Sequence, residues 1–275
     1  MRNLEIGVFS LSLYSKKMIV HIFIKGVDLM EEKYSLNKLN YRICGEGKDA
    51  LLLHGWGQST YQMLPIAHIL QGYRCLVVDL PGFGESCVPE NVLTIKDYAL
   101  IINRLCQKLK FKPSLVIGHS FGGKVAYAYA LSHKVEHLVL AAPSVIKPIK
   151  TIGQKARICL YKILKKVNKI TNNKCRKIMN KLGSKDYQNS HGVMRRIMVS
   201  SVNTYYDDSF ATYQGRVLLV YGSNDKITPL SEGKKIKSKL NNASLKIINK
   251  GDHFAYLEKR YTFVRYIQEF IGSED

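Results

Sequence analysis

From residue 30 onward, short apolar runs alternate with stretches whose apolar residues recur every three or four positions. The apolar runs fit strands buried on both faces of a parallel sheet, and the recurring positions fit amphipathic helices. We therefore predict an α/β architecture with a mostly parallel central sheet. The predicted strands are Ala50–Leu53, Cys75–Val78, Leu115–Ile117, Val135–Ala141, Val217–Tyr221 and Leu245–Ile248. The predicted helices are Tyr61–Leu70, Ile95–Lys108, Gly122–Ser132, Leu230–Leu240 and Glu258–Ile271.

The alternation stops between Ala141 and Val217, where helical spacing replaces any strand pattern. We predict a helical cap over residues 144–214, inserted into a core formed by residues 30–143 and 215–275. One apolar stripe within the cap runs at helical spacing from Ala156 to Ile170.

Residues 1–29 are apolar but are interrupted by Lys16 and Lys17, and they lack the roughly 20 consecutive apolar residues of a membrane span. We interpret them as an N-terminal extension, either loosely attached or translated from an over-called start at Met1. From Met30 onward, apolar and polar residues alternate as they do in a β-hairpin. The six cysteines show no C-x-x-C pair, which favours reduced thiols and a cytoplasmic location.

The strongest chemical signal is Gly118-His119-Ser120-Phe121-Gly122, between a predicted strand and a predicted helix. This is the G-x-S-x-G pattern of a tight turn that exposes a serine hydroxyl. Side chains at Gly118 and Gly122 would collide with neighbouring elements. We therefore predict that Ser120 is a nucleophile.

A serine nucleophile needs a base, and the base needs an orienting acid. Asp225 follows the strand Val217–Tyr221, and His253 follows the strand Leu245–Ile248. The carboxyl ends of parallel strands meet at one edge of the sheet, so Ser120, Asp225 and His253 are predicted to form a triad. Asp79 and Asp252 are the competing acids.

Two backbone N–H groups are predicted to form the oxyanion hole, those of Trp56 and Phe121. Trp56 lies in His54-Gly55-Trp56-Gly57, directly after a strand. We interpret His54 as a structural residue that braces this loop. Trp56, Phe121, Tyr187 and Met194 are candidates for binding the substrate, with ordinary packing as the alternative role for the last two. No cofactor and no metal site is expected.

These segments together resemble the α/β-hydrolase superfamily over about residues 33–272. The resemblance implies an α/β-hydrolase fold with a helical cap and hydrolysis of carboxylic esters without a cofactor. Ser120 argues against the subfamilies with Asp at that position. The HGWG segment and the segment Asp79–Gly84 are similar to those of pimeloyl-acyl carrier protein methyl ester carboxylesterases. One departure is that Lys259, rather than Pro, follows Glu258.

The chain carries 42 Lys and Arg against 21 Asp and Glu. Residues 147–196 contain fifteen of the basic residues and a single acid, Asp186. Either this is a solvated helix face, or the cap binds an acidic partner or an anionic surface. Nucleic acid is not expected, because no supporting motif is present.

The leading interpretation is a monomeric or weakly dimeric serine esterase acting on a small-molecule ester. Two alternatives remain open on the same residues. One is a hydrolase of carbon–carbon bonds that uses the same triad, and the other is a ligand-binding protein with little turnover.

Overall fold

The computed structural model describes residues 34–148, 184–210 and 212–273, with isolated helical positions between 153 and 167. The predicted N-terminal extension, residues 1–29, lies outside the described residues, as does most of the basic segment of the cap. Within the described residues, no helix is long and apolar enough to cross a membrane.

Seven strands form one sheet in the order β1-β3-β2-β4-β5-β6-β7. All neighbouring pairs are parallel except β1 and β3. The six strands predicted from apolar runs are therefore present, and β1 adds an antiparallel edge. The strands are β1 Tyr41–Cys44, β2 Lys48–Leu53, β3 Tyr73–Val78, β4 Leu115–His119, β5 His137–Ala141, β6 Arg216–Gly222 and β7 Ala243–Ile248.

The start of the described chain differs from the predicted hairpin. Residues 36–38 form a short 3-10 turn, η1, and β1 then pairs with β3 rather than with a preceding strand. β1 is therefore an edge strand of the main sheet, with Arg42 and Ile43 exposed and Tyr41 and Cys44 half-buried.

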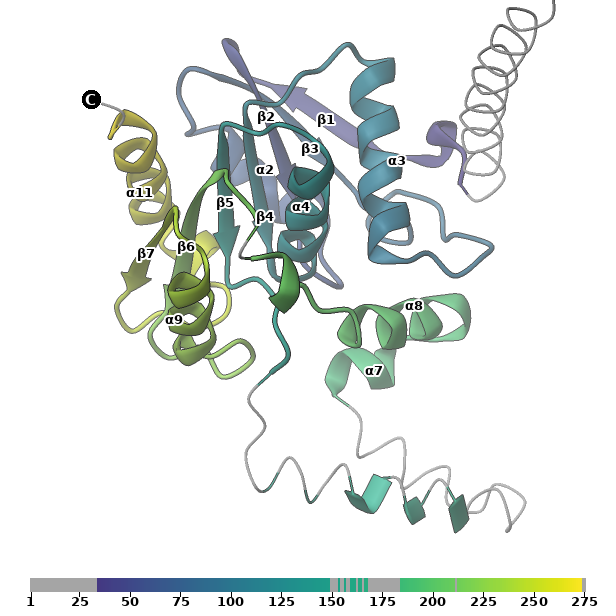
Figure 1. Ribbon diagram of the computed structural model, residues 1–275. Coiled ribbons are helices and arrows are strands. Elements are labelled where there is room, and N and C mark those ends of the chain that lie inside the picture. The colour runs from purple at the N-terminus through teal and green to yellow at the C-terminus, as the bar shows by residue number, and fades with distance from the viewer. Residues whose placement is uncertain are drawn as a thin grey trace, which may run out of the picture.

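Helices cover both faces of the sheet, as Figure 1 shows. Alternate strand residues explain the two layers: Leu51 and Leu53 pack in one apolar core, and Ala50 and Leu52 pack in the other. Helices α3, α4 and α9 contribute to the first core, whereas α2, α10 and α11 contribute to the second. Their bounds are α2 Thr60–Ala67, α3 Ile95–Lys108, α4 Ser120–Ser132, α9 Leu230–Lys239, α10 Ala255–Glu258 and α11 Arg260–Gly272.

The predicted final helix, Glu258–Ile271, corresponds to α11, and the short helix α10 precedes it and is separated from it by Lys259. This is the position where the expected Pro is missing. The break changes how the chain enters α11 but leaves the buried face of α11 on the core, with Phe263 and Ile267 fully buried.

In the described residues, the insertion between β5 and β6 contains helices and loops but no strand. It contains α7 (Lys185–Asn189), α8 (Gly192–Val202) and the 3-10 turn η2 (Asp207–Ser209). Figure 1 shows α7 and α8 beyond the carboxyl ends of the strands. Of the apolar stripe predicted in the cap, Leu160 and Ile163 are exposed.

Candidate active site

The nucleophile candidate lies at the junction of β4 and α4. Ser120 has φ of 49°, in the left-handed region that residues with a side chain rarely adopt. A Cβ on Gly118 would press against Gly122 and Gly123, and one on Gly122 would collide with the carbonyls of Leu53 and His54. The two glycines therefore allow the close approach of strand and helix that forces Ser120 into this turn.

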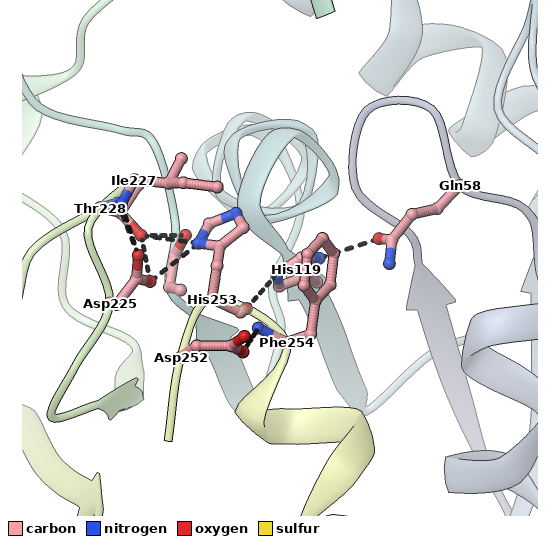
Figure 2. A network of polar contacts seen from close by, with 9 residues as sticks. Gln58, His119, Asp225, Ile227, Thr228, Asp252, His253 and Phe254 are labelled. Atoms are coloured by element: carbon pink, nitrogen blue, oxygen red, sulfur yellow. Dashed lines mark hydrogen bonds and ion pairs between the residues drawn. The ribbon is translucent and has the colours of Figure 1, made fainter. Parts of the chain in front are cut away.

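Asp225 and His253 meet at the carboxyl edge of the sheet, as predicted from the strands that precede them. His253 Nδ1 lies 2.8 Å from Asp225 Oδ2, and both side chains are buried. Figure 2 shows the two residues facing each other from neighbouring loops. In the described part of the chain, no acceptor or donor is hydrogen-bonded to His253 Nε2. The imidazole is therefore held by one nitrogen and available at the other.

Backbone groups fix the carboxylate of Asp225. The N–H groups of Ile227 and Thr228 donate to its Oδ1 at 2.8 and 3.0 Å. Burial by itself would raise the pKa of Asp225, but the hydrogen bond and charge of His253 and these backbone donors outweigh it and lower the pKa. Asp225 is therefore ionised at neutral pH and suited to stabilise a protonated imidazole.

Thr228 is a residue that the sequence reasoning missed. Its hydroxyl lies 2.9 Å from Asp225 Oδ2, 3.2 Å from His253 Nδ1 and 3.2 Å from the Ala142 carbonyl oxygen. The sequence held one signal for this role, a hydroxyl residue three positions after the predicted acid. At that spacing, both the backbone N–H and the side-chain hydroxyl can donate to the carboxylate.

His119 is a second missed residue, and it joins two loops of the site (Figure 2). Its Nε2 lies 3.0 Å from the His253 carbonyl oxygen, and its Nδ1 lies 2.9 Å from Gln58 Oε1. Gln58 in turn accepts from the Gly55 N–H at 2.7 Å. Burial, together with the neighbouring His253, lowers the pKa of His119 to about 3, so the ring is neutral at pH 7. The loop carrying Trp56 and the loop carrying His253 are thereby tied to one another.

The two competing residues named from the sequence have other partners. Asp79 accepts from Asn40 Nδ2 at 2.7 Å and from the backbone N–H groups of Thr60 and Glu85. Asp252 accepts from the Phe254 N–H at 2.7 Å. Neither carboxylate is hydrogen-bonded to His253 among the described residues.

The expected oxyanion donors, the N–H groups of Trp56 and Phe121, have no hydrogen-bond acceptor in the described part of the chain. Phe121 lies in the first turn of α4, where backbone N–H groups lack an intrahelical partner. The Trp56 and Phe121 rings pack edge to face with centroids 5.2 Å apart. This contact brings the two predicted donor residues side by side.

Ser120, Trp56 and Phe121 line a cavity of about 260 Å³. Met198 and Val202 of α8 close part of it. Tyr187 and Met194 are not among its described lining residues: the Tyr187 hydroxyl faces that of Tyr161 at 3.4 Å, and the Met194 sulfur lies against Gly82. The roles of all four residues in substrate binding remain predictions, and of the four only Trp56 and Phe121 are among the described residues that line this cavity.

Comparison with known proteins agrees with this architecture. A family model described as the alpha/beta hydrolase fold matches residues 51–165. An esterase from Exiguobacterium antarcticum superposes with a TM-score of 0.66 at 20% identity, covering 86% of this chain and 96% of the other. A meta-cleavage product hydrolase from Pseudomonas fluorescens gives a TM-score of 0.65 at 21% identity, covering 86% and 95%. The chain has the α/β-hydrolase fold.

The names of proteins similar in sequence to this chain include more than one activity. A 2-hydroxy-6-oxononadienedioate/2-hydroxy-6-oxononatrienedioate hydrolase of Pseudomonas putida is 25% identical, over 90% of this chain and 96% of its own. A pimeloyl-[acyl-carrier protein] methyl ester esterase of Chromobacterium violaceum is 24% identical, over 84% and 96%. The fold that the motifs predicted is confirmed, and the reaction belongs to the proposal below.

Proposed function

We propose that this hydrolase cleaves carboxylic esters with a Ser120–His253–Asp225 triad through an acyl-enzyme intermediate. The observation that carries the proposal is the buried contact of 2.8 Å between His253 Nδ1 and Asp225 Oδ2, at the sheet edge that also holds the strained Ser120. This arrangement leaves His253 Nε2 as the proton acceptor for the serine hydroxyl.

In the first half-reaction, Ser120 Oγ attacks the ester carbonyl carbon while its proton passes to His253 Nε2. Asp225 stabilises the imidazolium, and the N–H groups of Trp56 and Phe121 stabilise the oxyanion. The tetrahedral intermediate then expels the alcohol, which takes its proton from His253. In the second half-reaction, water loses a proton to His253, attacks the acyl-enzyme and releases the carboxylic acid and free Ser120.

Hydrolysis of a carbon–carbon bond by the same residues is the second candidate, and the observation that favours it is the relative from Pseudomonas putida. The name of that relative denotes a dicarboxylate substrate. In this chain, the cavity beside Ser120 is lined by Lys124 but also by Asp186 and Glu232. A dianion would meet two carboxylates there, which supports an ester as the substrate.

The test is hydrolysis of p-nitrophenyl acetate, butyrate and octanoate by the wild type and by Ser120→Ala. We expect turnover by the wild type and loss of at least about 10⁴-fold in kcat for the variant. Equal rates in the two proteins would overturn the proposal. Mass spectrometry after reaction with a fluorophosphonate gives an independent readout, because the adduct is expected on Ser120 alone. Cleavage of a 2-hydroxy-6-oxo-dienoate, with ester turnover absent, would instead establish the second candidate.

A further inference from the structure

A buried ammonium group lies one helical turn from the nucleophile candidate. Lys124 is 1% exposed and belongs to the same helix, α4, as Ser120. Residues four apart share a helix face, so Ser120 and Lys124 lie on the same side of α4. Both residues line the cavity of about 260 Å³.

Two of the three ammonium N–H groups of Lys124 have partners in the cap. Lys124 Nζ donates to the carbonyl oxygens of Ser201 and Thr204 at 2.7 and 2.9 Å. The Ser201 carbonyl belongs to the last turn of α8, and the Thr204 carbonyl follows the end of that helix. Among the described residues, no third acceptor is hydrogen-bonded to Nζ. One N–H therefore remains for an acceptor that a ligand brings.

A buried carboxylate lines the same cavity. Glu232 of α9 is 3% exposed and raises the pKa of Lys124, whereas burial lowers it, with a net result of about 8. The lysine is therefore charged at pH 7, and the two opposite charges offset one another. A carboxylate offers about four lone-pair sites, so Glu232 has room for a further donor. The cavity thus presents a hydrogen-bond donor and an acceptor without a net charge from this pair.

Other lining residues, among them Ile146, Met198 and Val202, are apolar and suit the hydrocarbon part of an acyl chain. A purely hydrocarbon chain would offer no acceptor to the remaining N–H of Lys124, which is unfavourable. A carboxylate at the end of the chain would meet Lys124 but be repelled by Glu232. A hydroxyl group satisfies both residues, because it accepts through oxygen and donates through O–H.

We infer that the acyl cavity selects esters with a hydroxyl group on the acyl chain, the oxygen accepting from Lys124 and the O–H donating to Glu232. The inference rests on the proposed ester hydrolysis. The pitch of an α-helix, about 5.4 Å, separates Ser120 from Lys124 along α4. The hydroxyl is therefore expected several carbons from the ester carbonyl, as in a 6-hydroxyhexanoyl group.

The test compares kcat/KM for methyl 6-hydroxyhexanoate, methyl heptanoate and monomethyl adipate, which place a hydroxyl, a methyl and a carboxylate at the same position. We expect the wild type to prefer the hydroxy ester over each of the other two by about tenfold or more, the effect of a hydrogen bond to a charged group. Lys124→Met is expected to abolish that preference. The matched control is Lys237→Met, which removes an exposed lysine from α9 and is expected to retain it.

A higher kcat/KM of the wild type for methyl heptanoate than for the hydroxy ester would overturn the inference. An equal loss of kcat/KM on all three esters in Lys124→Met would also overturn it, because Lys124 would then serve only to anchor α8. Because Lys124→Met also removes the partner of two α8 carbonyls, Glu232→Gln provides a second variant. It leaves those contacts in place and is expected to lower the hydroxyl preference at least threefold, and an unchanged preference would count against the inference.

The failure of this inference can be distinguished from the failure of the proposed function by measuring the binding of the same esters to Ser120→Ala by calorimetry. If the hydroxy ester binds this variant more tightly than heptanoate but no ester is turned over by the wild type, the cavity assignment stands and the ester chemistry fails. If esters are hydrolysed with no preference in rate or binding, the chemistry stands and the cavity assignment fails.

Discussion

Two pairs of buried His and Asp lie at the carboxyl edge of the same sheet, and among the described residues only one of these pairs is joined by a hydrogen bond, that between His253 and Asp225. His253 and Asp225 follow β7 and β6, whereas His54 and Asp79 follow β2 and β3. All four side chains are at most 7% exposed. Burial and position in the sheet therefore do not distinguish the two pairs.

The difference lies in where the ring nitrogens are directed. The Leu80 N–H donates to His54 Nε2 at 3.0 Å, and His54 Nδ1 lies 2.8 Å from the Gly55 carbonyl oxygen, so both nitrogens are used by the backbone. Burial lowers the pKa of His54 to about 4, which keeps the ring neutral. His253 uses one nitrogen on a carboxylate instead. A buried histidine is thus a candidate base only where one nitrogen is left for a substrate.

The sharpest test of this comparison is His253→Gln. It removes the group that takes the serine proton, so kcat for p-nitrophenyl butyrate is expected to fall by about 10⁴-fold or more. The melting temperature, followed by circular dichroism, serves as the control for folding. A folded variant with near wild-type kcat would show that His253 is not the base.

Asp225→Asn is expected to produce the next largest effect. The amide keeps much of the shape but lacks the charge that stabilises the imidazolium, and kcat is expected to drop by about 10³- to 10⁴-fold. The equivalent change in the other pair, Asp79→Asn, is the matched control and is expected to change kcat less than tenfold. Similar losses in the two variants would remove the distinction between the pairs.

The sequence predicted this distinction only in part. Ser120, Asp225 and His253 each follow a predicted strand. This was sufficient to place them at one edge of the sheet, because the carboxyl ends of parallel strands lie at the same edge. The structural role assigned to His54 rested on its adjacency to Gly55, and the contact with Leu80 N–H could not be foreseen, since it joins residues from different strands.

Residues whose roles depend on contacts far apart in sequence were the ones that sequence reasoning missed. Lys124 looks like one polar residue in an apolar helix, and its acceptors lie about eighty positions away in the cap. His119 was noted only as part of the elbow pattern, yet it contacts the loops of both Gln58 and His253. The hydrophobic pattern predicts which elements form, but not which distant backbone groups a buried polar side chain meets.

His54→Leu is expected to affect stability rather than catalysis. The substitution keeps an apolar side chain of similar bulk but leaves the buried Leu80 N–H without an acceptor. The free energy of unfolding in urea is expected to fall by about 1–3 kcal/mol. The activity of the folded fraction is expected to stay within tenfold of the wild type, and a larger loss would mean that His54 takes part in catalysis or shapes the Trp56 loop.

The smallest expected effect is the pH dependence of Asp79. Burial by itself would raise the pKa of Asp79, but the hydrogen bonds from Asn40, Glu85 and Thr60 outweigh it and lower the pKa below its ordinary value. Between the folded and unfolded pKa values the unfolded chain binds more protons, so this contribution is fully present above about pH 4 and is lost as pH falls through the folded pKa.

Urea unfolding of the wild type and of Asp79→Asn at pH 7, 5 and 3 measures this contribution. The difference in unfolding free energy is expected to be about 1–2 kcal/mol at pH 7 and at pH 5, and to shrink at pH 3, because the unfolded wild-type chain then binds a proton at this carboxyl and is stabilised relative to the folded state. A difference independent of pH would show that Asp79 acts through shape rather than charge. It would then differ from Asp225, whose charge the proposed reaction requires.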